Sequence, residues 1–277
     1  MALDKYSSTG LNQPQTSPRM GLFCFYLLFS IFLLIQINGN VCMDIINGNE
    51  ATPHSRPYMA LINNDAGSSC GGTLIKPNWV LTAAHCIVNN SKVILGAHNW
   101  RKREREQQRF SIARAVPHPC FDFKQKIHDI QLLQLKGVAK SNKFVSVLNL
   151  PTIDEDVKPG SICSTAGWGV TKVKGKASDV LRETNVTVVS RDKCNKIYKK
   201  IPNTEITTNM LCAGPAKKRN EDTCQGDSGG PLICDKRFSA IVSFGKTCGD
   251  PKYPGVYTRL TAKYLQWIRD ITGGADW

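Results

Sequence analysis

The sequence predicts an all-β protein with a barrel architecture and one helix at its C-terminal end. From Ile45 onward, short apolar segments alternate with clusters of Gly, Pro and Asn, which is the pattern of strands joined by turns. Strands that follow one another without intervening helices favour a barrel. Only residues 261–271 have helical spacing, and the apolar residues on their common face are Tyr264, Leu265, Ile268 and Ile271.

The clearest strand-and-turn segment spans 72–81, and similar segments recur at 92–95, 130–135, 186–189 and 240–243. We interpret the stretch 154–160, which is acidic and ends in Pro-Gly, as a link between two halves of the chain. With 41% hydrophobic and 21% charged residues, the 277-residue chain can bury a large core and is not expected to be disordered.

The residues before Ile45 contain an apolar run over 21–37, preceded by Arg19 and followed by polar residues. The run falls just short of a bilayer span, and its charge order is typical of an exported amino terminus. We therefore expect a signal peptide over 20–42 and an upstream extension without a folded role over 1–19. The alternative is an uncleaved signal anchor; we predict no stable membrane anchor.

Eleven cysteines in an exported chain indicate an oxidising compartment. Cys24 and Cys42 fall in the expected signal peptide, which leaves nine. Four bridges would use eight of them, and the remaining thiol suggests an intermolecular bond. No CxxC pair accompanies a histidine pair, so we predict no metal site, and we predict no cofactor.

The formal charge of +14 predicts anionic partners. Removal of 1–44 would take away two basic and two acidic residues, so the charge would not change. Basic runs at 101–105, 199–200 and 217–219 favour sulfated glycans, acidic proteins or nucleic acid, although solvated loops would have the same composition. Without aromatic interleaving or a zinc finger, sequence-specific binding of nucleic acid is not expected.

Three residues form a candidate catalytic set. Ser228 lies in the glycine-rich segment 226–231, which alone would indicate only a tight turn. His85 follows a predicted strand and is adjacent to Cys86; alone it would be interpreted as structural. A histidine that takes a serine proton must be held in one tautomer. Asp129 fits this role, because it begins an apolar strand and a buried carboxylate needs a partner. A capping or surface-paired aspartate is the alternative.

The motifs TAAHC at 82–86, HDIQLLQL at 128–135, AGWG at 166–169 and DTCQGDSGGP at 222–231 resemble the trypsin and chymotrypsin family of serine proteases. The resemblance extends over 45–271. It implies two six-stranded antiparallel β-barrels, at about 45–153 and 154–260, with the active site between them. It also implies that Ser228 attacks the substrate carbonyl, His85 acts as general base and then acid, and Asp129 orients His85. The amides of Gly226 and Ser228 would form the oxyanion hole.

The family resemblance also implies the substrate pocket and the disulfides. Asp222 corresponds to the pocket floor that receives Lys or Arg side chains, and Ser243, Gly245 and Gly255 correspond to its walls. The expected partners are proteins with Lys or Arg at the cleavage site, and serine protease inhibitors. The implied disulfides are Cys70–Cys86, Cys163–Cys234, Cys194–Cys212 and Cys224–Cys248.

The segment 45–48 resembles the amino terminus that proteolysis releases in this family, which implies that the Ile45 ammonium pairs with Asp227. Asn47 replaces a more usual glycine, and asparagine tolerates positive φ well. Asp44 argues against a trypsin-like activator. Signal cleavage after Cys42 would leave Met43-Asp44 as an activation dipeptide before the mature domain, 45–277.

Within the family, the segment TPHSRPYM at 52–59 resembles the granzymes. Cys120 corresponds to the loop cysteine that joins two protomers in one granzyme branch, which implies a disulfide-linked homodimer; a free thiol is the alternative. The resemblance implies secretion, or storage in cytolytic granules on sulfated proteoglycan. Asn89 and Asn185 lie in glycosylation sequons. The alternatives are another granzyme branch, a mast-cell or digestive tryptic protease, and a catalytically silent homologue that binds glycans.

Overall fold

The computed structural model describes residues 48–64, 69–171, 175–202, 204–215, 226–246, 250 and 252–273. They belong to a compact unit that spans Met43–Trp277. The predicted upstream extension, signal peptide and activation dipeptide lie outside the described residues, and so does Ile45. Within the part of the chain that is described, no helix is long and apolar enough to cross a membrane.

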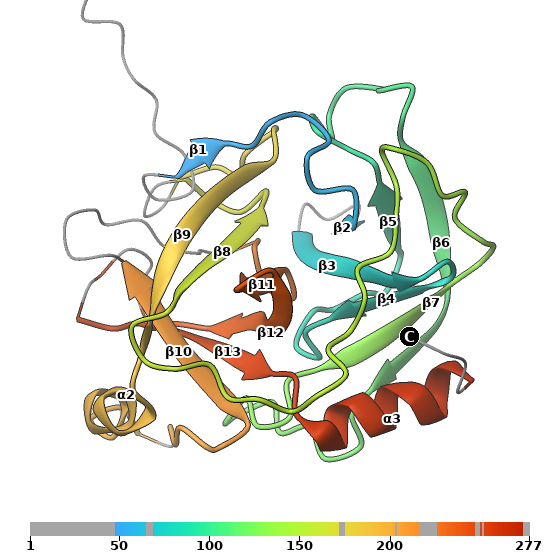
Figure 1. Cartoon of the computed structure of the whole chain (residues 1–277). Coiled ribbons are helices and arrows are strands. Elements are labelled where there is room, and N and C mark those ends of the chain that lie inside the picture. Colours follow the sequence, from blue (N-terminus) through green and yellow to red (C-terminus); the bar gives the residue numbers. More distant parts are fainter. Residues whose placement is uncertain are drawn as a thin grey trace, which may run out of the picture. The chain divides into compact units, whose positions relative to one another are not determined.

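The first half of the chain forms a closed barrel of six antiparallel strands, coloured blue to green in Figure 1. Its side chains alternate between the interior and the outside, and the interior cluster includes Ile62, Leu74, Val93 and Leu133. The predicted segment 72–81 is a hairpin that turns between β3 and β4. In spatial order the strands are β2 (Met59–Asn64), β3 (Ser69–Lys76), β4 (Trp79–Thr82), β7 (Gln131–Leu135), β6 (Gln108–Pro117) and β5 (Ser91–Leu95).

The second half forms another closed barrel, and a short strand, β1 (Asn49–Glu50), is added beside β9. Along β9 the side chains alternate strictly between buried and more exposed positions, which is the period of a strand with one face in a core. The prediction of two six-stranded antiparallel barrels is confirmed. In spatial order the strands are β8 (Ile162–Gly167), β9 (Arg182–Val189), β10 (Met210–Pro215), β13 (Gly255–Arg259), β12 (Arg237–Phe244) and β11 (Pro231–Cys234), and β11 closes the ring by pairing with β8.

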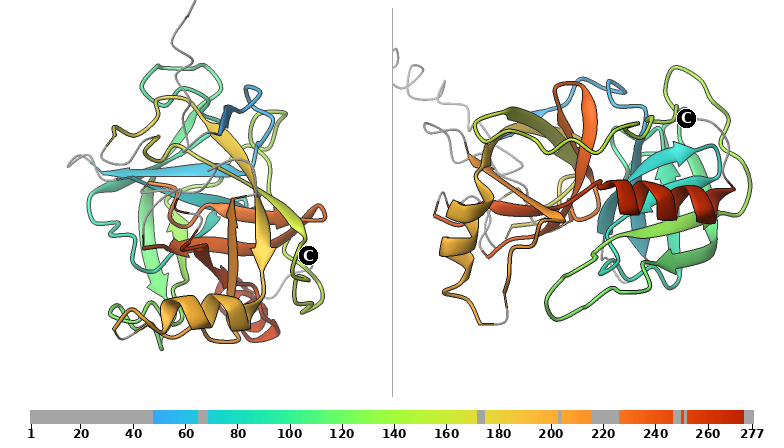
Figure 2. Two further views of the ribbon diagram at one scale, coloured as in Figure 1. Left: turned by 90° about the vertical axis from the view of Figure 1, so that its left-hand side faces the viewer. Right: turned by 60° about the horizontal axis from the view of Figure 1, so that its bottom comes forward.

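The predicted C-terminal helix is α3 (Ala262–Thr272), shown from further directions in Figure 2. The Thr261 side chain caps its first turn, and Gly273 ends it in the left-handed conformation. Its buried face belongs to a cluster that contains residues of both barrels, such as Leu81 and Leu132 from the first and Ile241 from the second. The helix therefore packs where the two barrels meet.

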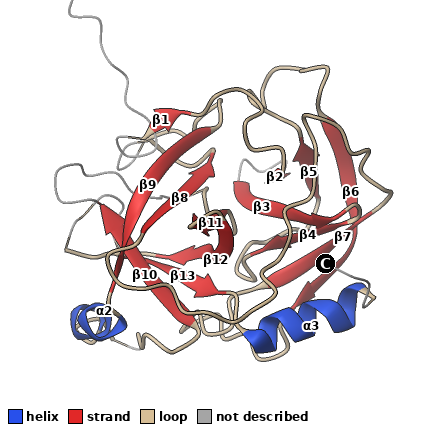
Figure 3. Cartoon of the chain, viewed as in Figure 1, coloured by secondary structure: helices blue, strands red, loops and turns tan. Residues whose placement is uncertain are grey.

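A second helix, α2 (Arg191–Tyr198), corrects the prediction that only the C-terminal segment is helical (Figure 3). Ser190 caps it, and only Cys194 and Tyr198 are buried, one turn apart. Two buried positions in eight residues give too little periodicity for sequence analysis to detect. A disulfide from Cys194 to Cys212 holds the helix against β10.

Candidate active site

Asp129 is fully buried two residues before β7, where residues of both barrels contact it. Its carboxylate accepts three hydrogen bonds. Oδ1 accepts from the backbone N–H of His85 at 2.9 Å, and Oδ2 lies 2.7 Å from His85 Nδ1 and 2.5 Å from the Ser243 hydroxyl. These three hydrogen bonds replace the water molecules that the carboxylate loses on burial, and so they stabilise its negative charge.

His85 is half-buried at the end of the first-barrel strand β4 and its following turn. Because Nδ1 faces a carboxylate, this nitrogen carries the ring proton, and Nε2 is left as the acceptor in the neutral ring. The backbone contact and the side-chain contact to Asp129 together fix the orientation of the ring. An imidazole held in this way can take a proton from a hydroxyl group at Nε2.

Ser228 is half-buried in a turn that has left-handed glycines on both sides, Gly226 with φ +98° and Gly229 with φ +81°. Only glycine adopts such angles without steric cost. A Cβ on Gly229 would also lie 2.0 Å from Thr82 Oγ1 and 2.7 Å from Ala83 N. The Ser228 turn of the second barrel therefore packs directly on the segment of the first barrel that leads to His85.

Two further contacts join the Ser228 turn to the first barrel. The Ser228 carbonyl oxygen accepts from Gly71 N at 2.8 Å and lies 3.7 Å from Cys86 Sγ, in the residue that follows His85. Cys86 is bonded to Cys70, which lies next to Gly71. The disulfide thus ties together the two backbone segments that contact Ser228.

Asp227 is fully buried next to the AGWG segment, and its Oδ1 accepts from Gly169 N at 2.8 Å. A Cβ on Gly169 would lie 2.5 Å from Asp227 Oδ2, and one on Gly167 would lie 2.1 Å from Oδ1. Both glycines leave the space that this carboxylate occupies. The predicted pairing of Asp227 with Ile45 falls on a residue outside the described ones and remains a prediction.

The predicted substrate pocket is described in part. Gly245 and Gly255 lie close together, since a Cβ on Gly245 would lie 4.0 Å from the Gly255 Cα. Ser243, predicted to line the pocket wall, directs its hydroxyl to Asp129 instead. Asp222, Cys224 and Cys248 lie outside the described residues.

Sequence reasoning missed the support that Thr258 and Gln131 give the site, and it assigned Ser243 to the pocket wall. Ser243 contacts the Asp129 carboxylate, Thr258 donates to the Asp129 carbonyl at 2.9 Å, and Gln131 donates to the carbonyls of Ala83 and Cys86. Ser243 and Thr258 lie far from Asp129 in sequence, and Gln131, although it shares the motif at 128–135 with Asp129, contacts carbonyls more than 40 positions away. Only the fold reveals their roles.

Among the described residues, three of the predicted disulfides are present, Cys70–Cys86, Cys163–Cys234 and Cys194–Cys212. Cys120 is free and exposed in the loop between β6 and Asp129. Asn89 and Asn185 are both exposed, and Asn185 lies on the outer face of β9.

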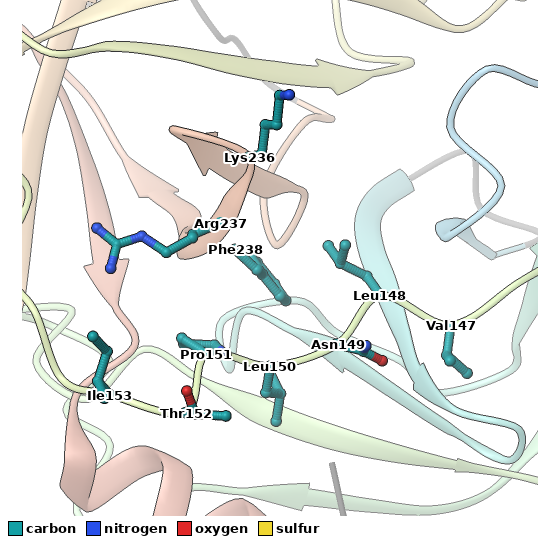
Figure 4. A pocket seen from close by; sticks show the side chains of 10 residues that line it. All are labelled: Val147, Leu148, Asn149, Leu150, Pro151, Thr152, Ile153, Lys236, Arg237 and Phe238. Carbon is teal, nitrogen blue, oxygen red and sulfur yellow. The ribbon is translucent and has the colours of Figure 1, made fainter.

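A surface pocket of about 480 Å³ lies apart from these residues (Figure 4). It is lined by the connection between the barrels, from Val147 to Ile153, and by Lys236, Arg237 and Phe238 at the turn between β11 and β12. None of His85, Asp129 and Ser228 lines it. The pocket is therefore not the candidate catalytic centre.

Two closed antiparallel barrels that hold a buried Asp–His pair against a glycine-flanked serine define a serine peptidase. The chain matches the family model described as Trypsin over residues 45–268. It is 50% identical to Granzyme A of Bos taurus over 236 residues, 84% of this chain and 90% of that protein. It is 43% identical to Mast cell protease 3 of Ovis aries over 246 residues, 88% and 95% of the two chains. It is also 43% identical to Granzyme B of Rattus norvegicus over 230 residues, 82% and 90% of the two chains.

The chain therefore belongs to the trypsin family of serine proteases. Within that family it is granzyme A-like, and the predictions of a serine endopeptidase and of granzyme relatives are confirmed.

Proposed function

We propose that the protein cleaves peptide bonds after Lys or Arg with Ser228, His85 and Asp129 as its catalytic residues. The observation that carries the proposal is the two-point contact between His85 and Asp129, packed against the Ser228 turn. A fixed tautomer, a buried counter-charge and a neighbouring hydroxyl are what base-assisted attack by serine requires.

In the first step, Ser228 Oγ bonds to the substrate carbonyl carbon while its proton passes to His85 Nε2. The resulting imidazolium is stabilised by Asp129, which keeps its charge. The carbonyl oxygen becomes an oxyanion, for which the amides of Gly226 and Ser228 would be donors. Proton return from His85 to the amine expels the first product, and water then repeats the sequence to release the acyl group.

Labelling with a fluorophosphonate tests this assignment, because the reagent bonds only to an activated serine. Processed protein that begins at Ile45 should be labelled, and Ser228→Ala should not. The matched control is Ser239→Ala, since the Ser239 hydroxyl only contacts the Arg237 carbonyl. If correctly processed protein is not labelled, a catalytically silent glycan-binding homologue becomes the better assignment.

Specificity for Lys or Arg rests on Asp222, which the family pattern puts at the pocket floor. A carboxylate there attracts a cationic side chain, and the adjacent glycines Gly245 and Gly255 leave room for it. An arginyl amide substrate should be cut much faster than a phenylalanyl one. Asp222→Ser should reverse this preference. Equal rates for both substrates with the unmodified enzyme would exclude the proposed specificity for Lys or Arg.

Activation is proposed to depend on removal of Met43-Asp44 and pairing of the new Ile45 ammonium with Asp227. The buried carboxylate of Asp227 lies directly before Ser228, so its position determines the conformation of the oxyanion-hole backbone. Protein that retains Met43-Asp44 should be nearly inactive. Full turnover by the unprocessed form would exclude this switch.

For biological setting, we propose secretion or storage in cytolytic granules of cytotoxic lymphocytes, on the basis of the granzyme relatives and the signal-like run. Domain boundaries stay as predicted from sequence. Protein substrates and protease inhibitors follow from the family. The exposed runs at 101–105 and 199–200 support binding to sulfated proteoglycan, and the run at 217–219 lies outside the described residues.

The exposed thiol of Cys120 supports a disulfide-linked homodimer. Electrophoresis without and with reductant decides between dimer and free thiol, with Cys120→Ser as the monomeric reference. The exposed sequons at Asn89 and Asn185 are proposed glycosylation sites, which a shift on treatment with glycosidase would reveal.

A further inference from the structure

Two imidazole rings are stacked at the base of the loop that leads to Asp129. The rings of His118 and His128 have centroids 4.8 Å apart and an interplanar angle of 16°. We call this pair the histidine stack. Tyr264 of α3 meets both rings edge-on, and its hydroxyl lies 2.8 Å from His128 Nδ1. Trp267 covers His118 from the next turn of the helix.

The backbone at the histidine stack is closely connected to Asp129. His128 has φ +55°, a left-handed conformation that costs energy for a residue with a Cβ. Its carbonyl accepts from Ile130 N at 2.8 Å, which makes a three-residue turn centred on Asp129. Ile130 O in turn accepts from His118 N at 2.9 Å. The side-chain contacts of His128 thus hold the strained backbone from which the Asp129 carboxylate extends.

The surroundings of the histidine stack favour its neutral form. Burial lowers the pKa of both histidines, that of His118 further through His128 and that of His128 further through Lys263. Lys126 faces Asp129 from the same loop. The other titratable or charged groups around Tyr264 and the stack are Asp129 and Cys120 from the loop, and Arg259 at the end of β13.

We propose that the histidine stack positions Asp129 and releases it in acid, so that His128 is a positioning residue for catalysis and the loop is a built-in pH switch. When both rings gain protons, two like charges face each other across the stack. A proton on Nδ1 also makes this nitrogen a donor, so the Tyr264 hydroxyl can no longer donate to it. The left-handed turn at His128 then relaxes, and the Asp129 carboxylate moves away from His85.

The direction of the pH effect follows from the lowered pKa of both histidines. The folded state prefers the neutral rings, so the stability they contribute is complete above about pH 6.5, their ordinary pKa. That stability is lost as the pH falls through the lowered values. The inference rests on the proposed function, because it needs Asp129 to orient His85.

Three substitutions isolate the effect. His118→Phe keeps a stacked ring that cannot gain a proton. His128→Asn keeps a side chain that can bond to Tyr264, remains neutral, and tolerates positive φ. The control is His54→Asn, because His54 is also left-handed, with φ +60°, but packs against Phe144 away from this loop.

The experiment measures kcat and KM of processed full-length domain on an arginyl substrate, from about pH 8 to about pH 5. Each proton that must be absent for activity steepens the fall of kcat by about tenfold per pH unit. The unmodified enzyme and His54→Asn should fall more steeply than about tenfold per unit. His118→Phe, which leaves one titrating ring in the stack, should fall less steeply than the unmodified enzyme, and His128→Asn, which removes the proton that breaks the Tyr264 contact, should fall least, with KM unchanged. Equal slopes in all four proteins would overturn the proposal.

Thermal unfolding over the same pH range separates the two ways in which the proposal could fail. The unmodified protein should lose more Tm between neutral and acid pH than His118→Phe. If it does so while all kcat slopes are equal, the histidine stack titrates but does not position Asp129, and the proposal is wrong. If Asp129→Asn retains full kcat at neutral pH, the proposed function itself is wrong.

Discussion

The hydroxyl of Ser243 lies 2.5 Å from Oδ2 of Asp129, although 114 residues separate the two in sequence. The contact links β12 of the second barrel to the loop before β7 of the first. It shares the oxygen that His85 Nδ1 contacts, so the carboxylate is held by both barrels at once.

Ser243→Ala should lower kcat and should also destabilise the protein, because the buried Asp129 carboxylate loses one of its donors. A hydrogen bond to a charged group contributes about 1.5–3 kcal/mol, which corresponds to about a 10- to 100-fold loss of rate if Asp129 is less well held in the transition state. Steady-state kinetics on an arginyl substrate would measure it, with Ser239→Ala as control. A Ser243→Ala enzyme with unchanged kcat would show that His85 and the backbone suffice to fix Asp129.

Gly169→Ala should destabilise the protein by about 1–3 kcal/mol, because its Cβ would press on the Asp227 carboxylate. Gly245→Ala is the contrasting variant: among the described residues its Cβ would meet only the Gly255 Cα, at 4.0 Å, so stability should change by less than about 0.5 kcal/mol. It should nevertheless reduce kcat/KM for arginyl substrates by narrowing the proposed pocket. Denaturant unfolding measures the stability of both variants, and steady-state kinetics measures their kcat/KM. Equal losses of stability would show that contact with the Asp227 carboxylate does not determine the cost at Gly169.

Two disulfides close loops of nearly equal length, with sequence separations of 16 for Cys70–Cys86 and 18 for Cys194–Cys212. Removing either pair by double Ala substitution should therefore cost a similar amount, about 3 kcal/mol. Only the first pair adjoins His85 and the Ser228 carbonyl. At a temperature where both variants are folded, loss of Cys70–Cys86 should reduce kcat much more. Comparable kcat values would contradict the role assigned to that bridge.

Asp154 caps the start of α3 by accepting from Ala262 N, and it pairs with Arg259 at 2.5 Å. Burial alone would raise the pKa of this carboxyl, but the Ala262 amide and the Arg259 guanidinium together lower it. The stabilisation of the folded state by Asp154 is therefore complete above its ordinary pKa of 3.8 and is lost as the pH falls below that value. Asp154→Asn should lower the free energy of unfolding by about 1 kcal/mol at neutral pH. Below the ordinary pKa of 3.8 it should have little effect.

Unfolding of Asp154→Asn at several pH values, with Glu155→Gln as control, would check this. Glu155 pairs with Arg237, but both side chains are largely exposed, so its removal should have little effect at any pH. A pH-independent penalty in Asp154→Asn would argue against an electrostatic cap.

Much of the proposed site could be predicted because its residues occur in short sequence motifs. The residues around His85 and Ser228 predict a strand end and a turn. Asp129 was found because a carboxylate at the start of an apolar strand must be buried and must have a partner. The helix α3 was predicted almost to its ends, since four apolar residues share one face and a glycine follows.

What sequence could not supply depends on how distant segments meet. The roles of Ser243 and Thr258 follow from the packing of β12 and β13 beside Asp129, which no local pattern encodes. The same holds for His118 and His128, whose stacking depends on Tyr264 more than 130 positions further along the chain. Helix α2 was missed because its burial is limited to Cys194 and Tyr198.

The close approach of Gly229 to Thr82 makes hydrolysis a property of two halves that must stay docked. Severing the connection at 136–161 would yield two fragments, one with His85 and Asp129 and the other with Ser228. Neither fragment alone holds the complete set of proposed catalytic residues. Activity that returns when the two fragments are mixed would be proportional to the number of reassembled molecules. Hydrolysis of a substrate could therefore serve as an assay of fragment association.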